Sequence, residues 1–198
     1  MISIEHKFIF VHIPKTAGTT IKTWLKKVIG ECPEPVWEHF KIKEIVHMFH
    51  ETFFQECFKF TFVRNPWDRA VSHYFYFRSE RYRKKNPVKW RKYSSVSFDE
   101  FVKRKMMFMP QFENIVDNRG RVRIDFVGKF ESIIEDLGFV ADKIGVKKPD
   151  ILPISNKTEH NDYRSYYNSK TIEIIKDYYK NDIELFGYDF NQPKILGF

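Results

Sequence analysis

The sequence predicts an α/β fold in which a parallel β-sheet is flanked by helices. Two short apolar segments rich in β-forming residues, Lys7–Ile13 and Phe58–Val63, are each followed by a proline and then by a helical pattern. A third segment, Ile124–Lys129, also leads into a helical pattern. Because strands that alternate with helices are typical of βαβ units, these segments are expected to form one parallel sheet.

Four helical patterns accompany the expected strands. Thr19–Ile29 places apolar residues on one face, and Gly30 follows it as a residue typical of helix ends. Phe130–Ile144 shows similar apolar spacing directly after the third strand. Ser97–Met107 opens with serine and glutamate at the spacing of a capping box, and Ser169–Phe186 carries one apolar stripe along its length.

Length and composition indicate one folded domain. A chain of 198 residues and 24.0 kDa without internal repeats has the size of a single domain, so one domain over residues 1–198 is expected. Hydrophobic residues at 42% and aromatic residues at 18% exclude intrinsic disorder. No apolar run is long enough to span a membrane and no signal peptide opens the chain, so the expected location is cytoplasmic. The polar stretch 149–167 is expected to be a long loop.

The net charge of +8 is concentrated in one segment, Arg78 to Lys92. This segment carries eight basic residues and one acidic residue, and such a concentration indicates an anionic partner. Aromatic residues lie among the cations, as in proteins that bind single-stranded nucleic acid. The same composition suits a polyanionic glycan, an anionic lipid surface or a plain solvated face.

The first candidate site is the segment from Phe10 to Thr20, which has the sequence FVHIPKTAGTT. A strand ends at Ile13, a loop of small residues follows, and a helix begins near Thr19. Backbone N–H groups at such a helix start can hold an anion, and Lys15 adds a positive charge in the same loop. The order is not that of a Walker A loop, because the lysine precedes the glycine. By itself the pattern also fits an ordinary strand–turn–helix with a surface lysine.

The second candidate site is the sequence FVRNPWDRAVS, residues 62–72. Pro66 suits the first turn of the helix that follows the strand. Arg64 at the end of the strand and Ser72 two turns into the helix could converge on one anion, because arginine offers a planar fork to phosphate. Asp68 could orient Arg64 or Arg69. A surface cluster of ion pairs is the alternative interpretation.

Together the two segments resemble the sulfotransferases that use 3′-phosphoadenosine 5′-phosphosulfate (PAPS). In that family a PKTAGTT-like loop binds the 5′-phosphosulfate, and an arginine with a serine at the spacing seen here binds the 3′-phosphate. The chain looks most similar to the carbohydrate sulfotransferase branch, which includes chondroitin and heparan sulfate enzymes and small bacterial homologues. The segments Phe126–Glu131 and Phe186–Phe190 also resemble that branch. The resemblance implies a single P-loop-kinase-like domain.

The resemblance also implies roles for individual residues. The phosphosulfate would be held by the first loop, and the 3′-phosphate by the second segment: Lys15, Thr16, Ala17, Gly18, Thr19 and Thr20 for the former, Arg64 and Ser72 for the latter. The stretch Asn156–Thr158, which contains Lys157, falls where relatives contribute a loop beside the cofactor. Lys129 stands where the family has an arginine, which keeps the positive charge and loses the planar fork.

Sulfuryl transfer to a hydroxyl needs a group that takes the proton, and histidine is suited to this near neutral pH. His39 lies 25 residues before Arg64 and shortly before Lys43–Ile45, as a histidine does in bacterial relatives, so it is the expected base. His47 and His50, one helical turn apart, are alternatives. These two histidines also fit part of a metal site, but no third ligand has the required spacing, and the family's reaction needs no metal.

The resemblance therefore implies an enzyme that transfers the sulfuryl group of PAPS to a hydroxyl, with Lys15 and His39 as the expected catalytic residues. The expected acceptor is a saccharide or glycolipid, anionic in view of the basic segment, which would also suit peripheral contact with a membrane. No metal and no nucleic acid are expected. Two other classes remain open. A P-loop-type nucleotide kinase would need the Walker A order, and a non-enzymatic protein that binds nucleic acid or another polyanion would leave both anion loops unexplained.

Overall fold

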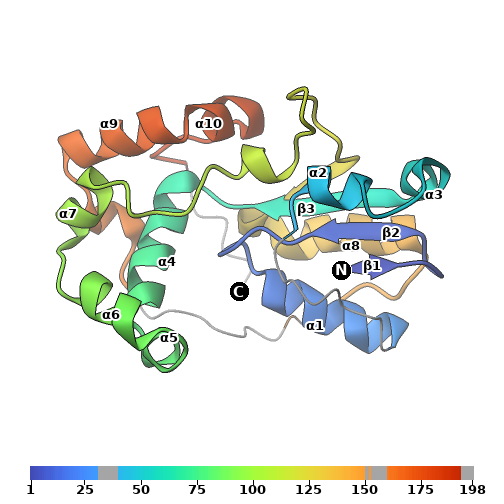
Figure 1. The fold of residues 1–198 in the computed structure, drawn as a ribbon, viewed down its shortest axis with the longest axis horizontal. Coiled ribbons are helices and arrows are strands. Elements are labelled where there is room, and N and C mark those ends of the chain that lie inside the picture. Colours follow the sequence, from blue (N-terminus) through green and yellow to red (C-terminus); the bar gives the residue numbers. More distant parts are fainter. Residues whose placement is uncertain (31–39, 150–151, 153–159, 193–198) are drawn as a thin grey trace. The chain divides into compact units, whose positions relative to one another are not determined.

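The computed structural model describes residues 1–30, 40–149, 152 and 160–192 (Figure 1). The chain divides into two compact units, and each unit is assembled from separate stretches of sequence. The sheet unit comprises Met1–Arg64 and Gln111–Asn156, and the helical unit comprises Asn65–Pro110 and Lys157–Pro193, so far as these are described. The expectation of one domain over residues 1–198 stays a prediction.

The sheet unit contains four strands in the order β1-β2-β3-β4. They are β1 Ile2–Ser3, β2 Phe8–Val11, β3 Phe58–Val63 and β4 Phe126–Lys129. β2, β3 and β4 are mutually parallel, which confirms the predicted parallel sheet, whereas the two-residue β1 is antiparallel to β2 and was not predicted. Because the three parallel strands run together, their carboxyl ends lie at one edge of the sheet.

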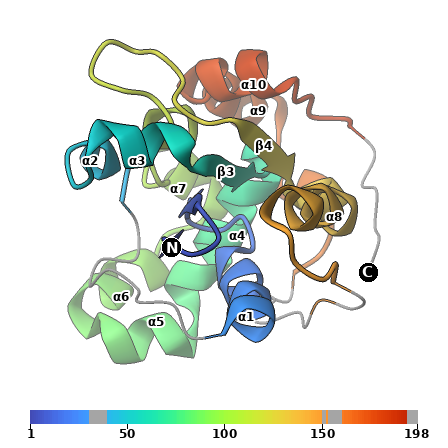
Figure 2. The same ribbon diagram turned by 90° about the vertical axis from the view of Figure 1, so that its right-hand side faces the viewer.

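Helices cover both faces of the sheet, which confirms the α/β fold. Alternate residues of β2 and β3 point to one face, where they pack against α1 Gly18–Ile29 and α8 Ile133–Ile144. The intervening residues of β2 point to the other face, where they pack against α2 Ile42–Val46 and α3 Glu51–Glu56. Figure 2 shows α8 on one side of the sheet and α2 and α3 on the other.

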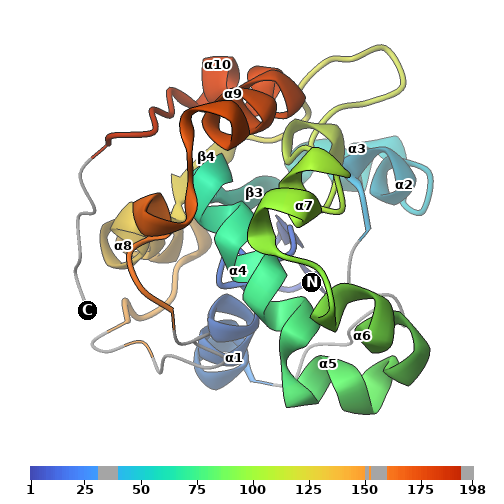
Figure 3. The same cartoon turned by 90° about the vertical axis from the view of Figure 1, so that its left-hand side faces the viewer.

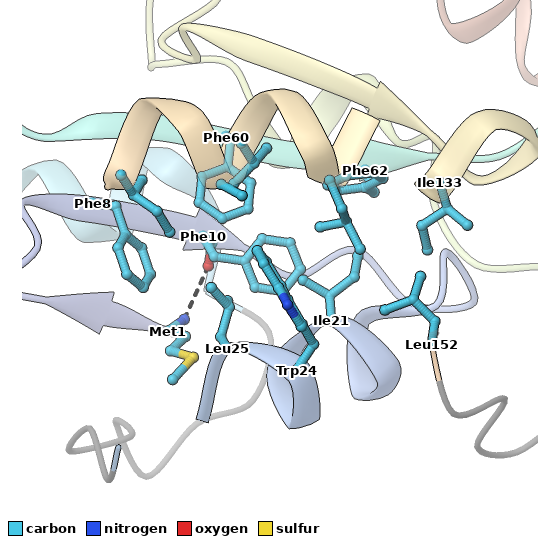
Figure 4. Packing of buried hydrophobic residues seen from close by; sticks show 14 residues of the cluster. Met1, Phe8, Phe10, Ile21, Trp24, Leu25, Phe60, Phe62, Ile133 and Leu152 are labelled. Atoms are coloured by element: carbon cyan, nitrogen blue, oxygen red, sulfur yellow. Dashed lines mark hydrogen bonds between the residues drawn. The ribbon is translucent and has the colours of Figure 1, made fainter. Parts of the chain in front are cut away.

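The core between the sheet and α1 fixes the helix that follows the first candidate loop. Figure 4 shows the side chains of Ile21, Trp24 and Leu25 of α1 facing the phenylalanines of β2 and β3, and all three are almost fully buried. Burying a side chain of this size stabilises the fold by roughly 1.5–3 kcal/mol. The amino group of Met1 donates a hydrogen bond of 2.9 Å to the carbonyl of Phe10 in the same cluster.

The helical unit has an aromatic interior. Its helices are α4 Pro66–Arg78, α5 Glu80–Lys85, α6 Pro87–Ser94, α7 Phe98–Lys103, α9 Ser169–Tyr178 and α10 Lys180–Phe186. Figure 3 shows α4 with α5, α6 and α7 beside it. Phe77 of α4 stacks on Tyr93 with ring centroids 4.5 Å apart, and aromatic pairs of this kind connect the helices. The basic segment is therefore helical, which was not predicted.

Two predicted helices differ from the observed ones. The stripe along Ser169–Phe186 predicts one helix, but the helix is interrupted at Tyr179. Hydrogen bonds continue on both sides, from Tyr179 N–H to Ile175 and from Ile183 N–H to Tyr179, so the interruption is a local distortion. The buried Tyr179 hydroxyl donates to the carbonyl of Phe108 at 2.7 Å, a contact that apolar spacing does not reveal.

The helix predicted from Ser97 is capped as expected but shorter. The Ser97 side chain accepts the Glu100 N–H at 3.2 Å, and α7 ends at Lys103, with Lys105 in the left-handed region at a φ of 50°. Short 3₁₀ turns occur at Phe112–Asn114, Phe130–Ser132 and Tyr163–Tyr166, the last within the stretch expected to be a loop. Among the described helices, none combines the length and apolar composition needed to cross a bilayer.

Candidate functional site

The loop between β2 and α1 has an unusual backbone. Lys15 and Ala17 both lie in the left-handed region, at φ values of 70° and 66°. Non-glycine residues seldom adopt this conformation, which costs of order 1 kcal/mol each and is often found where a loop is shaped for a ligand. Between them the Thr16 hydroxyl donates to the carbonyl of Ile13 at 2.9 Å and is fully buried, so the Thr16 side chain closes the loop on itself.

The first turn of α1 is suited to an anion. Its N-cap residue, Ala17, makes no side-chain capping hydrogen bond, and the first turn contains no acidic residue. The N–H groups of a helix start have no partner within the helix, and the helix dipole places partial positive charge there. α1 is twelve residues long and held by the sheet core, so this charge is fixed in position. A phosphate or sulfate group fits such a site.

Gly18 is required by the packing beneath the loop. A Cβ atom at Gly18 would lie 1.8 Å from Cδ2 of His12, closer than any real contact. The His12 ring in turn stacks on Phe10 at a centroid distance of 6.0 Å and is mostly buried. The loop therefore rests directly on the imidazole at the end of β2, and this contact demands glycine.

Arg64 brings the second motif to the first loop. It follows β3 at the carboxyl edge of the sheet and is only 8% exposed. Its Nη1 donates to the carbonyl of Lys15 at 3.4 Å, and its guanidinium lies 4.2 Å from the centre of the Phe130 ring. A cation over an aromatic face is attracted to it. The structure therefore places a guanidinium beside the loop that starts α1.

Gln111 fixes the backbone that carries Arg64. Its side-chain Oε1 accepts the Arg64 N–H at 2.9 Å, and its Nε2 donates to the Arg64 carbonyl at 2.9 Å. Gln111 is fully buried. One amide side chain thus replaces a strand partner at the point where β3 ends.

The second residue of the Arg-Ser pair lies in the other unit. Ser72 is in α4 of the helical unit and is 2% exposed. α4 begins as predicted with Pro66 in its first turn, and the Asn65 side chain caps it by accepting the Trp67 N–H at 3.0 Å. Asp68, which was expected to orient Arg64 or Arg69, is also in α4 of the helical unit and is buried.

Two of the predicted site residues, His39 and Lys157, lie outside the described residues. The rival histidines are both exposed and flank a break between helices, with His47 following α2 and His50 preceding α3. The expectation that they lie one turn apart on a helix is therefore wrong. His50 Nδ1 accepts the Thr52 N–H at 3.4 Å, so this ring caps α3.

A polar cavity of about 460 Å³ lies at the opposite end of β3. It is lined by residues 55–59 and 122–125. Lys59 inside it forms an ion pair of 2.8 Å with Asp125 and donates to the carbonyl of Cys57 at 2.6 Å. Burial raises the pKa of the Cys57 thiol, which favours the unreactive neutral form. The positive charge of Lys59 is compensated by Asp125, whereas an anion site is expected to keep its positive charge for the ligand.

Over the described stretches, no three metal-ligating side chains gather.

Sequence reasoning missed three residues that shape the site. Gln111 lies in no motif, and no local signal marks its two hydrogen bonds to Arg64. Phe130 belongs to the FVGKFE segment that supports the resemblance, but its place under a guanidinium depends on the pairing of β3 with β4. His12 was expected within the strand Lys7–Ile13, but β2 ends at Val11 and His12 follows it, where its contact with Gly18 adds a reason for the glycine.

These features define a class of protein. An uncapped helix start and an arginine at the carboxyl edge of a parallel sheet are typical of an α/β enzyme that binds a phosphate or sulfate group. A profile of the sulfotransferase family matches residues 1–189, and the chain belongs to this family. It is therefore a transferase of sulfuryl groups to hydroxyl-bearing acceptors, which favours this class over the nucleotide kinase and the non-enzymatic binder.

Individual proteins are also similar to this chain. An uncharacterized protein of Archaeoglobus fulgidus is 33% identical over 107 residues, which cover 52% of this chain and 78% of that protein. The crystal structure of mouse sulfotransferase SULT7A1 complexed with PAP matches at a TM-score of 0.55 and 14% identity, and covers 90% of this chain and 84% of that one. The second similarity shows that the fold is that of a sulfotransferase, as the resemblance implied.

Proposed function

We propose that the protein transfers the sulfuryl group of PAPS to a hydroxyl of a saccharide or glycolipid. The observation that carries the proposal is the contact between the Arg64 guanidinium and the carbonyl of Lys15, because it joins the two motifs at the start of α1. The match to the sulfotransferase family and the similarity to a sulfotransferase complexed with PAP support it. The carbohydrate acceptor rests on the resemblance of the sequence to that branch.

In this proposal the first loop holds the 5′ end of the donor. The backbone N–H groups at the start of α1 would donate to its oxygens, together with the hydroxyls of Thr19 and Thr20. PAPS supplies an activated sulfuryl group whose departure leaves negative charge on a phosphate. The Lys15 ammonium would stabilise that developing charge, and a fixed helix dipole does so without reorganising during the reaction.

Arg64 and Ser72 would hold the 3′-phosphate of the nucleotide. A guanidinium already oriented by the Phe130 ring and by the Lys15 carbonyl loses little further freedom on binding. Its planar fork suits two phosphate oxygens. Lys157 would add a positive charge on the cofactor side, as the resemblance implies.

His39 would take the proton of the acceptor hydroxyl. His50 is a weaker candidate because its Nδ1 is engaged by the Thr52 N–H, and His47 ends a short helix. An acceptor with several hydroxyls, such as a saccharide, is sulfated where one hydroxyl meets both the base and the donor, so positioning would decide the product.

The donor assignment is tested by calorimetric titration with 3′-phosphoadenosine 5′-phosphate and with adenosine 5′-phosphate. Wild-type protein should bind the first about 10- to 150-fold more tightly, which corresponds to a charge-assisted contact of about 1.5–3 kcal/mol. Arg64→Ala should bind both nucleotides about equally. Arg104→Ala, which removes an exposed arginine paired with Glu100, is the matched control and should behave as wild type. Equal discrimination in Arg64→Ala and wild type would disprove the role of Arg64, and tighter binding of ATP would indicate a kinase.

The base is tested by kinetics with PAPS and a saccharide acceptor. His39→Ala should lower kcat by about 10²- to 10⁴-fold and leave PAPS affinity near that of wild type, because only proton removal is lost. His47→Ala and His50→Ala should each stay within about tenfold of wild type. A deep loss of activity in either of these, with His39→Ala active, would move the base to that residue.

A further inference from the structure

The two short helices α5 and α6 form a strongly basic surface at one end of α4. They contact each other and α4, and Figure 3 shows them side by side. Their basic side chains are all exposed, and we call them the α5–α6 basic surface: Arg81, Arg83, Lys84, Lys85, Lys89, Arg91 and Lys92. Glu80 is the one acidic residue of these helices, and it pairs with Arg83 at 2.7 Å.

Most of this charge is not compensated within the described chain. Five of the cations form no ion pair with any described residue: Lys84, Lys85, Lys89, Arg91 and Lys92. Some exposed basic residues elsewhere do have an acidic partner, as Lys103 has Asp99 and Arg104 has Glu100. The five cations therefore repel one another, and an external anionic surface would relieve that repulsion.

The aromatic residues of this segment face inward. Tyr82 is 7% exposed, and Tyr93 stacks on Phe77 of α4. Trp90 is half-buried, and its indole N–H donates to the carbonyl of Arg78 at 3.1 Å. Proteins that bind single-stranded nucleic acid stack the bases on exposed aromatic rings. The aromatic residues of this segment instead pack against α4 and one another, so they stabilise the helices. The outer surface of these described helices is therefore positively charged but has no exposed aromatic ring on which a base could stack.

One large apolar side chain lies among the cations. Val88, in the first turn of α6, is 82% exposed, the highest fraction among the exposed large hydrophobic side chains of the described residues. A sulfated polysaccharide offers little apolar surface, and nucleic acid offers its bases to aromatic rings, whereas the boundary between headgroups and acyl chains accepts an aliphatic side chain. Lysines predominate among the five cations, and lysine acts as a point charge without the bidentate geometry of a specific phosphate site.

We infer that the α5–α6 basic surface docks the protein on an anionic lipid bilayer, with the cations among the headgroups and Val88 at the acyl boundary. This inference goes beyond the proposed sulfuryl transfer and does not depend on it. Each basic residue near an anionic bilayer raises binding about fivefold, or about 1 kcal/mol, and the effect falls off within a Debye length. Removing the five uncompensated cations together should therefore weaken binding by more than about a hundredfold.

The test is cosedimentation of the full chain with vesicles. Wild-type protein should bind phosphatidylcholine vesicles containing about 30% phosphatidylserine, fail to bind pure phosphatidylcholine vesicles, and dissociate as salt rises to about 0.5 M. A variant with glutamine at positions 84, 85, 89, 91 and 92 should lose this binding. The matched control removes the same number of exposed positive charges elsewhere and should bind within about fivefold of wild type; its substitutions are Lys27→Gln, Lys143→Gln, Lys170→Gln, Lys176→Gln and Lys180→Gln.

The variant Val88→Ser distinguishes binding to a bilayer from binding to a soluble polyanion. Docking on a bilayer predicts that Val88→Ser weakens vesicle binding by about three- to tenfold and leaves binding to heparin or to an oligonucleotide unchanged. Equal vesicle binding by the five-site variant and its control would overturn the inference. So would heparin or oligonucleotide binding as tight as vesicle binding with no effect of Val88→Ser, because the surface would then serve a soluble polyanion. Because all of these side chains are exposed, each variant is expected to fold, and circular dichroism checks this.

Discussion

Replacing Gln111 by leucine should release Arg64 from its fixed position. The Gln111 amide makes two hydrogen bonds, each of 2.9 Å, with the N–H and the carbonyl of Arg64. Leucine is close in size and fills the same buried space, so the change removes the hydrogen bonds with little change in packing. The Arg64 N–H and carbonyl would both be left buried without these partners.

The expected cost follows from those two groups. A buried donor or acceptor that loses its partner costs about 1–3 kcal/mol, so Gln111→Leu should lower the free energy of unfolding by roughly 2–6 kcal/mol. Urea unfolding measures this, and the slope of the transition should be unchanged. Nucleotide affinity should fall by about tenfold or more, because the guanidinium is no longer held beside Lys15. Gln55→Leu, at an exposed position, is the control and should stay within about 0.5 kcal/mol of wild type.

Gln111→Glu distinguishes the two hydrogen bonds. A carboxylate can still accept the Arg64 N–H but places a second acceptor against the Arg64 carbonyl. Burial raises the pKa of such a carboxyl group, so protonation restores the donor and the stability deficit should shrink as the pH falls. An unfolding free energy of Gln111→Leu within about 0.5 kcal/mol of wild type would refute the argument. A pH-independent deficit in Gln111→Glu would refute the assignment of the donor bond.

Two further predictions concern the sheet unit. Gly18→Ala should lower the free energy of unfolding by about 1–3 kcal/mol because its Cβ would meet the His12 ring, and combining it with His12→Ala should cost less than the sum of the two single changes in urea unfolding. Asp117 accepts N–H groups of Arg121 and Arg119, which lowers its pKa to about 2 from an ordinary 3.8. Because its folded-state pKa is lowered, it contributes stability above about pH 4 that is lost as the pH falls toward 2. Its carboxyl carbon should titrate near pH 2 by NMR, and a midpoint near 4 would contradict the hydrogen bonding.

The sequence predicts the sheet unit better than the helical unit, for a physical reason. β2 and β3 alternate phenylalanines with other residues, and α1 and α8 repeat apolar residues with helical spacing, so each element is marked by its own sequence. At Tyr179, where the helix is interrupted, the side chain instead makes a hydrogen bond to Phe108, seventy-one residues away. Local periodicity cannot reveal a contact of that kind.

The candidate site divides in the same way. The loop from Lys15 to Thr20 and Arg64 are recognisable because they are short motifs next to strands, and the structure brings Lys15 and Arg64 into contact. Gln111 and Phe130 reach Arg64 only through the fold, so no spacing in the sequence predicts them. The helices of the basic segment were missed because α6 buries no residue completely, which leaves no apolar stripe to detect.

The pairing of β3 with β4 also sets the order of events during synthesis. Phe60 pairs with Phe126, and the whole of Asn65–Pro110 is made between these two strands. At a translation rate of about 5–20 residues per second, roughly 3–13 s pass between the synthesis of β3 and that of β4. Throughout that interval the strand FKFTFV has one edge open, and an open apolar edge invites pairing with other chains. The nascent chain is therefore most vulnerable to aggregation after β3 is made and before Phe126–Lys129 emerges, which is when a chaperone would protect it best.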